Sequence, residues 1–169
     1  MTLAVMLALL LGPPMLLGGL GRWRPGLALD LRLRMRIGMS SMLVFTGVGH
    51  FLKTQEMIAM LPEALPRRRE IVLATGILEL AAAIGLHLPG LRRRAAIGLA
   101  LFFLAAFPAN AYSALAATGL GGRGALYLLV RAPAQILFVF WAVACAGPPR
   151  RRREVPATTD RDPESDPDP

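Results

Sequence analysis

Five apolar runs, each close to the length that crosses a lipid bilayer, constrain this chain of 169 residues more than any other feature. A helix needs about 20 predominantly apolar residues to span a hydrocarbon core of about 30 Å. The runs cover residues 2–21, 37–52, 71–89, 95–115 and 125–146. The chain is 54% hydrophobic with a mean hydropathy of +0.50, and its charges lie mostly between the runs. We therefore expect an all-α, polytopic membrane protein.

The first run, residues 2–21, is either a retained helix or a cleaved signal peptide. Pro13-Pro14 and Gly18-Gly19 interrupt it, and lipid tolerates helix breakers only where neighbouring groups satisfy the freed backbone. No basic residue precedes the run, and no small-residue cleavage site is well placed after it. The sequence thus favours a retained helix at residues 2–21, outside the main bundle, over a cleaved signal peptide. With the basic linker that follows, it forms an N-terminal segment, 1–36.

Arginines predict the orientation of the runs. Alternate connections, together with the segment after the fifth run, carry twelve arginines, whereas the opposite side carries five basic residues. The twelve are Arg22, Arg24, Arg32, Arg34, Arg36, Arg92, Arg93, Arg94 and Arg150 to Arg153; the five are Lys53, Arg67, Arg68, Arg69 and Arg123. By the positive-inside rule, the N-terminus lies outside and the C-terminus in the cytoplasm.

The final segment, 147–169, differs in composition from the rest of the chain. It begins with basic residues and ends in an acidic, proline-rich stretch without apolar periodicity. Such a segment cannot bury a core, so we expect a disordered cytoplasmic tail. The lipid bilayer is the expected partner of the basic loops, and nucleic acid is not, because the arginines are divided among several loops.

Five polar residues within the apolar runs are candidate site residues, because such residues cost free energy in lipid unless they face the bundle interior. They are His50, Glu79, Asn110, Arg131 and Gln135. A helix rises about 1.5 Å per residue, which places all five roughly 3 to 15 Å below the outer boundary of the membrane. We therefore expect one shared polar site. Structural glue between helices is the alternative.

Spacing within the runs adds detail to this polar cluster. Arg131 and Gln135 are four residues apart and point the same way. Glu79 lies on a face with Thr75, Gly76, Ala82 and Ala83, whose small side chains allow close approach of a neighbouring helix. A carboxylate on a packed face needs a partner, and Arg131 is the cation at matching depth. We therefore expect a Glu79–Arg131 ion pair.

Two prolines lie close to the candidate residues and predict helix kinks. Pro108 precedes Asn110, and Pro133 lies between Arg131 and Gln135. Each proline frees the carbonyl four residues earlier, and irregular backbone at depth usually lines a polar cavity or is buried by protein.

The sequence offers no ligand set for a metal or a bound redox cofactor. The chain has one cysteine, Cys145, and two histidines. His50 and His87 are expected on opposite sides of the membrane, which argues against a haem held by both. We expect no metal and no cofactor ligated by this chain.

Several motifs resemble the DoxX or DoxX-like family of small bacterial membrane proteins. They are GVGHF, LPEALP, TGILELAAAIGL, RRRAAIGLALFFLAAFPANAY and LVRAPAQILFVFWA, within residues 37–146. The resemblance implies a four-helix transmembrane bundle in the bacterial cytoplasmic (inner) membrane, preceded by one extra helix. It also implies a quinone-linked role and partner subunits in a redox complex.

Three functions stay open on this evidence. The first is a redox-complex subunit whose polar cluster binds a quinone. The second is a membrane scaffold or assembly protein whose polar cluster is structural. The third is a small proton-coupled transporter that uses Glu79. The sequence does not say whether the chain is an enzyme. Four helices make a thin bundle, so self-association or partner subunits are expected.

Overall fold

The computed structural model describes residues 2–24, 26, 29–116 and 125–147, and these residues contain helices and turns but no strand. The helices are α1 (Thr2–Trp23), α2 (Leu31–Leu52), α3 (Thr54–Ile58), α4 (Arg68–Gly85), α5 (Arg92–Leu115) and α6 (Ala125–Cys145). The all-α prediction is confirmed, and the five long helices lie at the five apolar runs. Predictions for Arg123, Arg150 to Arg153 and the tail from residue 148 fall outside the described residues.

Three of the described helices are long and apolar enough to cross a membrane. They are Leu3–Trp23 in α1, Arg92–Leu115 (all of α5) and Tyr127–Cys145 in α6. The helices α2 and α4 are more polar, because charged residues occupy their first turns. Length and composition therefore indicate membrane association through three helices. That α2 and α4 also cross, as a four-helix transmembrane bundle requires, stays a prediction.

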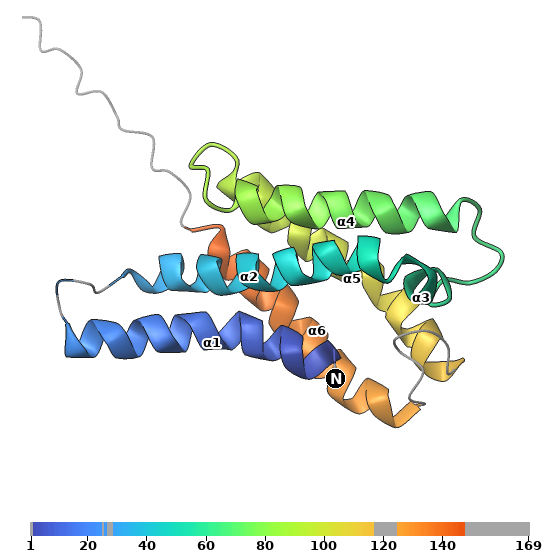
Figure 1. The fold of residues 1–169 in the computed structure, drawn as a ribbon, viewed down its shortest axis with the longest axis horizontal. Helices are drawn as coiled ribbons and strands as arrows, with labels where there is room; N and C mark the ends of the chain where they lie inside the picture. Colours follow the sequence, from blue (N-terminus) through green and yellow to red (C-terminus); the bar gives the residue numbers. More distant parts are fainter. Residues whose placement is uncertain (1, 25, 27–28, 117–124, 148–169) are drawn as a thin grey trace, which may run out of the picture.

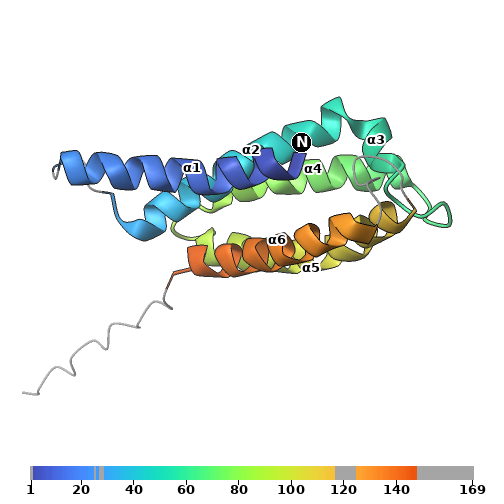
Figure 2. The same ribbon diagram turned by 90° about the horizontal axis from the view of Figure 1, so that it is seen from below.

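The long helices form two layers. In Figure 1, α2 lies between α1 and α4, and the three run along a common direction. Figure 2 shows α5 and α6 side by side in a second layer beneath them. The short helix α3 and the connection to α4 lie at one end of the bundle, and the α4–α5 turn lies at the other.

The first helix packs against α2 through its proline pair. Pro14 frees the Leu10 carbonyl, and that oxygen faces Gly38 of α2 so closely that a Cβ atom at Gly38 would overlap it. Leu10 is fully buried, and Leu3 and Met6 are also part of the core. The expectation that this helix lies outside the main bundle is therefore wrong, because its apolar face enters the core.

The α2–α4 contact depends on small residues, as predicted for this face of α4. A Cβ atom on Gly76 would lie 2.7 Å from the His50 Cβ, and one on Gly47 would lie 3.2 Å from the Gly76 carbonyl oxygen. Near the other end of the contact, the Ser40 hydroxyl donates to the Ala83 carbonyl at 3.0 Å. Close backbone approach and interhelical hydrogen bonds thus join these two helices.

Along a long helix, one part contributes side chains to the apolar core and the other part lines the cavity. In α2, buried Met39, Met42 and Leu43 precede the cavity-lining Thr46 and His50. The helices α4, α5 and α6 divide in the same way, and Phe103 and Phe138 mark the boundary, their ring centroids 5.7 Å apart. One half of the bundle is filled by apolar side chains, and the half beside α3 is hollow.

The α1–α2 contact generates a stability prediction. We expect Gly38→Ala to destabilise the protein by about 1–3 kcal/mol, because the new methyl group would meet backbone and a rigid proline ring, neither of which can move aside cheaply. Gly98→Ala is the matched control, since nothing lies within 4 Å of its Cβ position. Thermal unfolding in detergent measures both variants; equal stability of the two would contradict this packing.

Candidate functional site

A cavity of about 550 Å³ lies between the two layers, beside α3. All five polar residues singled out in the sequence line it: His50, Glu79, Asn110, Arg131 and Gln135. Its volume falls within the range of about 300–1,000 Å³ that is typical of small-molecule sites. The structure thus brings the five residues together, whereas ligand binding by them stays a prediction.

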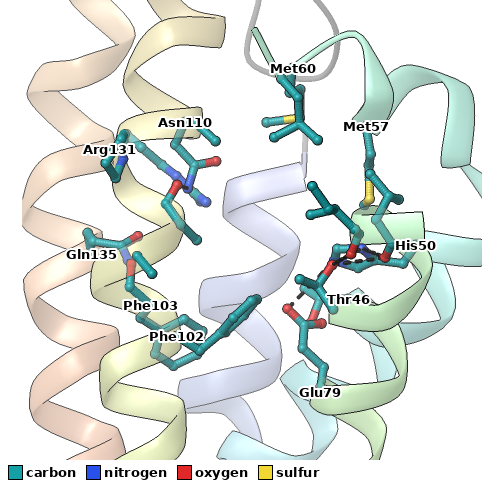
Figure 3. Close-up of a pocket in the computed structure, with 18 of the residues that line it drawn as sticks. Thr46, His50, Met57, Met60, Glu79, Phe102, Phe103, Asn110, Arg131 and Gln135 are labelled. Carbon is teal, nitrogen blue, oxygen red and sulfur yellow. Dashed lines mark hydrogen bonds and ion pairs between the residues drawn. The ribbon is translucent and has the colours of Figure 1, made fainter. Parts of the chain in front are cut away.

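The polar residues stand on two facing walls (Figure 3). Arg131, Asn110 and Gln135 come from α5 and α6, and His50 and Glu79 come from α2 and α4. The cavity separates the two walls. A molecule bound there would meet an amide and guanidinium wall on one side and an imidazole and carboxylate wall on the other.

Apolar side chains line the remainder of the cavity. Met57 and Met60 lie toward the α3 end, and Phe102 and Phe103 lie toward the filled half of the bundle. Methionine side chains are flexible and adapt to irregular apolar partners. The cavity therefore combines a few polar groups with a mainly apolar surface.

His50 and Glu79 form an ion-pair arrangement between α2 and α4. The His50 Nδ1 lies 2.8 Å from the Val72 carbonyl oxygen, which can only accept, so Nδ1 carries a proton. The His50 Nε2 then faces the Glu79 Oε1 at 3.7 Å. The two side chains therefore lie within ion-pair range but beyond hydrogen-bond distance of each other.

The expected Glu79–Arg131 ion pair is wrong. Among the described residues, Glu79 makes its ion pair with His50, and the cavity lies between Glu79 and Arg131. Equal depth along two helices does not make those helices neighbours. The second carboxylate oxygen, Glu79 Oε2, is buried and has no hydrogen-bond partner in the described part of the chain.

Arg131 is held at the edge of α1 instead. Its Nη1 lies 3.8 Å from the Met6 sulfur, which is a weak acceptor. The Tyr127 side chain, one turn earlier in α6, interacts with the guanidinium. The Arg131 Nε is buried without a hydrogen-bond partner among the described residues. This guanidinium therefore retains donor capacity inside the cavity.

The two amide residues are bound to backbone carbonyls of α5. The Gln135 Nε2 donates to the Phe103 carbonyl and so joins α6 to α5. The Asn110 Nδ2 donates to the Ala106 carbonyl at 3.0 Å, within its own helix. Pro108 and Pro133 lie inside helices that continue through them. Gln135 thus joins two helices, whereas the Asn110 bond stays within α5.

Sequence reasoning missed part of the lining. Thr46 and Tyr127 both line the cavity, each one helical turn before a residue that was singled out. Helical neighbours at i−4 share a face, so this rule would have found both. Lining residues from the connection after α3, such as Leu61 and Leu65, carry no comparable signal.

His87 lies apart from the cavity, beyond the end of α4. Its exposed ring places Nε2 3.0 Å from the Ser40 hydroxyl oxygen. His50, by contrast, faces the cavity in the other half of the bundle. No group of three or more His, Cys, Asp or Glu residues that could hold a metal ion occurs within the described ranges.

Comparison with known proteins yields one family. A family model described as "Domain of unknown function (DUF8561)" matches residues 39–146. No curated protein and no solved structure matches the chain.

The resemblance to the DoxX family is therefore wrong, because the family model that matches this region is a different one. The motifs behind the resemblance consist of small residues, prolines and isolated polar residues on apolar helices. Helix packing in membranes favours such residues generally, so they are weak evidence for a particular family.

The His50–Glu79 contact generates a double-mutant prediction. We expect His50→Leu and Glu79→Leu each to destabilise the protein, because each leaves a polar partner uncompensated. The double variant should be more stable than the sum of the singles implies, with a coupling of about 0.5–3 kcal/mol. The same cycle with Arg131→Leu in place of His50→Leu should give a smaller coupling. A larger coupling to Arg131 would contradict the observed pairing.

His87 generates a pH prediction. Partial burial lowers the pKa of His87 below its ordinary value of 6.5, and the charges of Arg36 and Arg92 lower it further. The folded protein then binds this proton less readily than the unfolded chain does. Stability from this group is therefore complete above about pH 6.5 and falls as the pH drops below it.

His87→Gln tests the pH prediction, since it removes the titrating ring and retains a polar side chain near Ser40. Wild type should lose more thermal stability than His87→Gln between about pH 7.5 and about pH 5. His50 is present in both proteins, so the difference isolates His87. Identical pH profiles would contradict the lowered pKa.

Proposed function

The chain belongs to the DUF8561 family, and we propose that it is an integral membrane protein that binds a small amphipathic molecule in the cavity between its two helix layers. The polar head of the molecule would lie between Arg131 and the His50–Glu79 pair, and its apolar part would lie against the methionine and phenylalanine side chains.

One observation carries this proposal. Glu79 Oε2, an acceptor, and Arg131 Nε, a donor, are both buried and unpaired in the described part of the chain, and their side chains line one cavity. An unsatisfied buried polar atom costs about 1–3 kcal/mol, and more when it is charged. A molecule that supplied the missing partners would recover part of that cost. The arrangement therefore supports a ligand with hydrogen-bonding groups on two sides.

A quinone is the first ligand class to test. Its two carbonyl oxygens accept hydrogen bonds, and its isoprenoid tail is apolar. Arg131 and, after an amide reorientation, Asn110 can donate from one wall, and a protonated His50 can donate from the other. These residues fit a quinone head group by chemistry, although the same donors suit other amphipaths, such as a fatty acid.

We place the protein in the bacterial cytoplasmic membrane with α2 and α4 also crossing the bilayer, so that α2, α4, α5 and α6 form the transmembrane bundle. Two features support this placement. The arginines of α2 lie in its first turns, where they can extend toward the interface, and the polar side chains in the middle of α2 and α4 face protein and cavity. The basic end would face the cytoplasm.

A scaffold or assembly role is the second candidate. It is favoured by interhelical polar contacts that need no ligand: Gln135 to the Phe103 carbonyl, His50 to the Val72 carbonyl and Ser40 to the Ala83 carbonyl. Such contacts hold helices in register. A small proton-coupled transporter is a third reading, supported by the His50–Glu79 pair alone.

The binding proposal is tested by thermal unfolding of the detergent-purified protein with short-chain ubiquinone and menaquinone analogues and with laurate. A ligand specific for the folded state stabilises it by about 2.7 kcal/mol at 100 times its Kd. We expect a saturable rise in Tm with at least one probe in wild type, and its loss in Arg131→Met. Ser41→Ala is the matched control, because that hydroxyl donates to the Ile37 carbonyl of its own helix and should leave binding intact.

The opposite pattern would favour the scaffold. If no probe raises Tm in wild type, the cavity has no ligand of this class. The protein should then co-purify with a partner subunit or with itself, while neither binding a quinone nor moving solute in liposomes.

A further inference from the structure

The end of the bundle opposite the cavity holds two arginines in a fixed arrangement. Arg36 and Ser40 are four residues apart in α2 and therefore share a face. The Ser40 hydroxyl contacts both the Ala83 carbonyl and the His87 ring, each at 3.0 Å. Arg36 is thus directed toward the turn that joins α4 to α5.

The second arginine comes from that turn. Arg92 is the first residue of α5, and its Nε donates to the Leu86 carbonyl at 3.3 Å, beside His87. The Arg36 Nε similarly donates to the Arg32 carbonyl at 3.1 Å. Each Nε–H group is thereby held by backbone, which orients both guanidinium groups and leaves their terminal amino groups as donors.

In the described part of the chain, no carboxylate lies in ion-pair contact with Arg36 or Arg92. Asp30 acts on Arg36 only at longer range, and its carboxylate accepts the Arg32 backbone N–H at 3.2 Å. Arg36 lies one turn before Ser40, which contacts the His87 ring. Arg92 is held at the carbonyl of Leu86, the residue before His87, so both positive charges lie near His87. Such a cluster attracts an anion.

We propose that Arg36 and Arg92 form a binding site for the phosphate group of an anionic phospholipid. Guanidinium groups donate in a planar fork that matches phosphate oxygens, and two forks from different helices can share one phosphate. This site is independent of the ligand proposed for the cavity.

The surroundings favour a lipid over a free phosphate. Arg92 stands where the apolar helix α5 begins, which is the headgroup level of a spanning helix. Leu88 and Leu91, in the same turn, are 45% and 46% exposed and offer apolar contacts for an acyl chain. The indole of Trp141 donates to the Met35 carbonyl at 3.0 Å near this end, as interfacial aromatic residues commonly do.

The experiment compares lipids on the detergent-purified full chain, by native mass spectrometry and thermal unfolding. Phosphatidylglycerol and phosphatidylcholine with the same acyl chains are the probes. We expect phosphatidylglycerol to remain bound and to raise Tm, and phosphatidylcholine to do neither. Arg36→Gln and Arg92→Gln should each reduce phosphatidylglycerol retention at least fivefold. Arg93→Gln, an exposed neighbour with the same charge change, should retain most of it.

Three results would overturn the proposal. Equal retention of both lipids would remove the charge requirement, and equal losses in Arg93→Gln and Arg36→Gln would indicate diffuse surface attraction. An equal rise in Tm with inorganic phosphate would indicate a free-anion site. If Arg36→Gln does not fold, Arg36→Lys replaces it: the charge remains but the planar fork is lost, so retention should still fall below that of Arg93→Gln.

Discussion

The close approach of α2 to the helices on either side of it is the constraint on which the arrangement of the rest depends. Gly38 lets the Leu10 carbonyl of α1 lie against α2, and Gly47 and Gly76 bring the α2 and α4 backbones together. Three helices are thereby joined into one layer. The pair α5 and α6 packs on that layer through larger side chains, among them Phe103 and Phe138. The two layers meet in one half of the bundle and enclose a cavity in the other.

The cavity explains why polar side chains are tolerated in this half. In low dielectric, each buried polar group needs a partner, and the helices supply several: the Val72 carbonyl for His50 and the Phe103 carbonyl for Gln135. Among the described residues, one atom of Glu79 and one of Arg131, on opposite walls, are left without a hydrogen-bond partner. Their incomplete pairing distinguishes a candidate binding site from helix packing alone, in which every polar group would be satisfied.

The two ends of the bundle differ in chemistry. At one end the cavity is covered by α3 and the connection that follows it, where acidic residues accompany the basic ones, as in the Lys53–Glu56 ion pair at 2.7 Å. At the other end, arginines of α2 and α5 gather without acidic partners in the described residues. A membrane offers different surroundings to its two faces, and this asymmetry is the physical basis of the proposed orientation.

The sequence by itself determined where the helices lie, and it predicted the depth of the polar residues along them. Apolar run length indicates the first, and a constant rise per residue predicts the second; His50, Glu79 and Arg131 were expected at one level, and all three line the cavity. The small residues beside Glu79 also indicated a close helix contact. Family membership was misjudged, because packing motifs of this kind recur in unrelated membrane proteins.

Only the tertiary structure decided which residues face one another. Depth says nothing about the order of helices around a bundle, so the sequence could not show that Glu79 pairs with His50 and that a cavity separates it from Arg131. Nor could it show that α1 enters the core, since that depends on a proline-freed carbonyl meeting a glycine on another helix. Rise along a helix is a local property, whereas neighbour identity is settled by the packing of all the helices together.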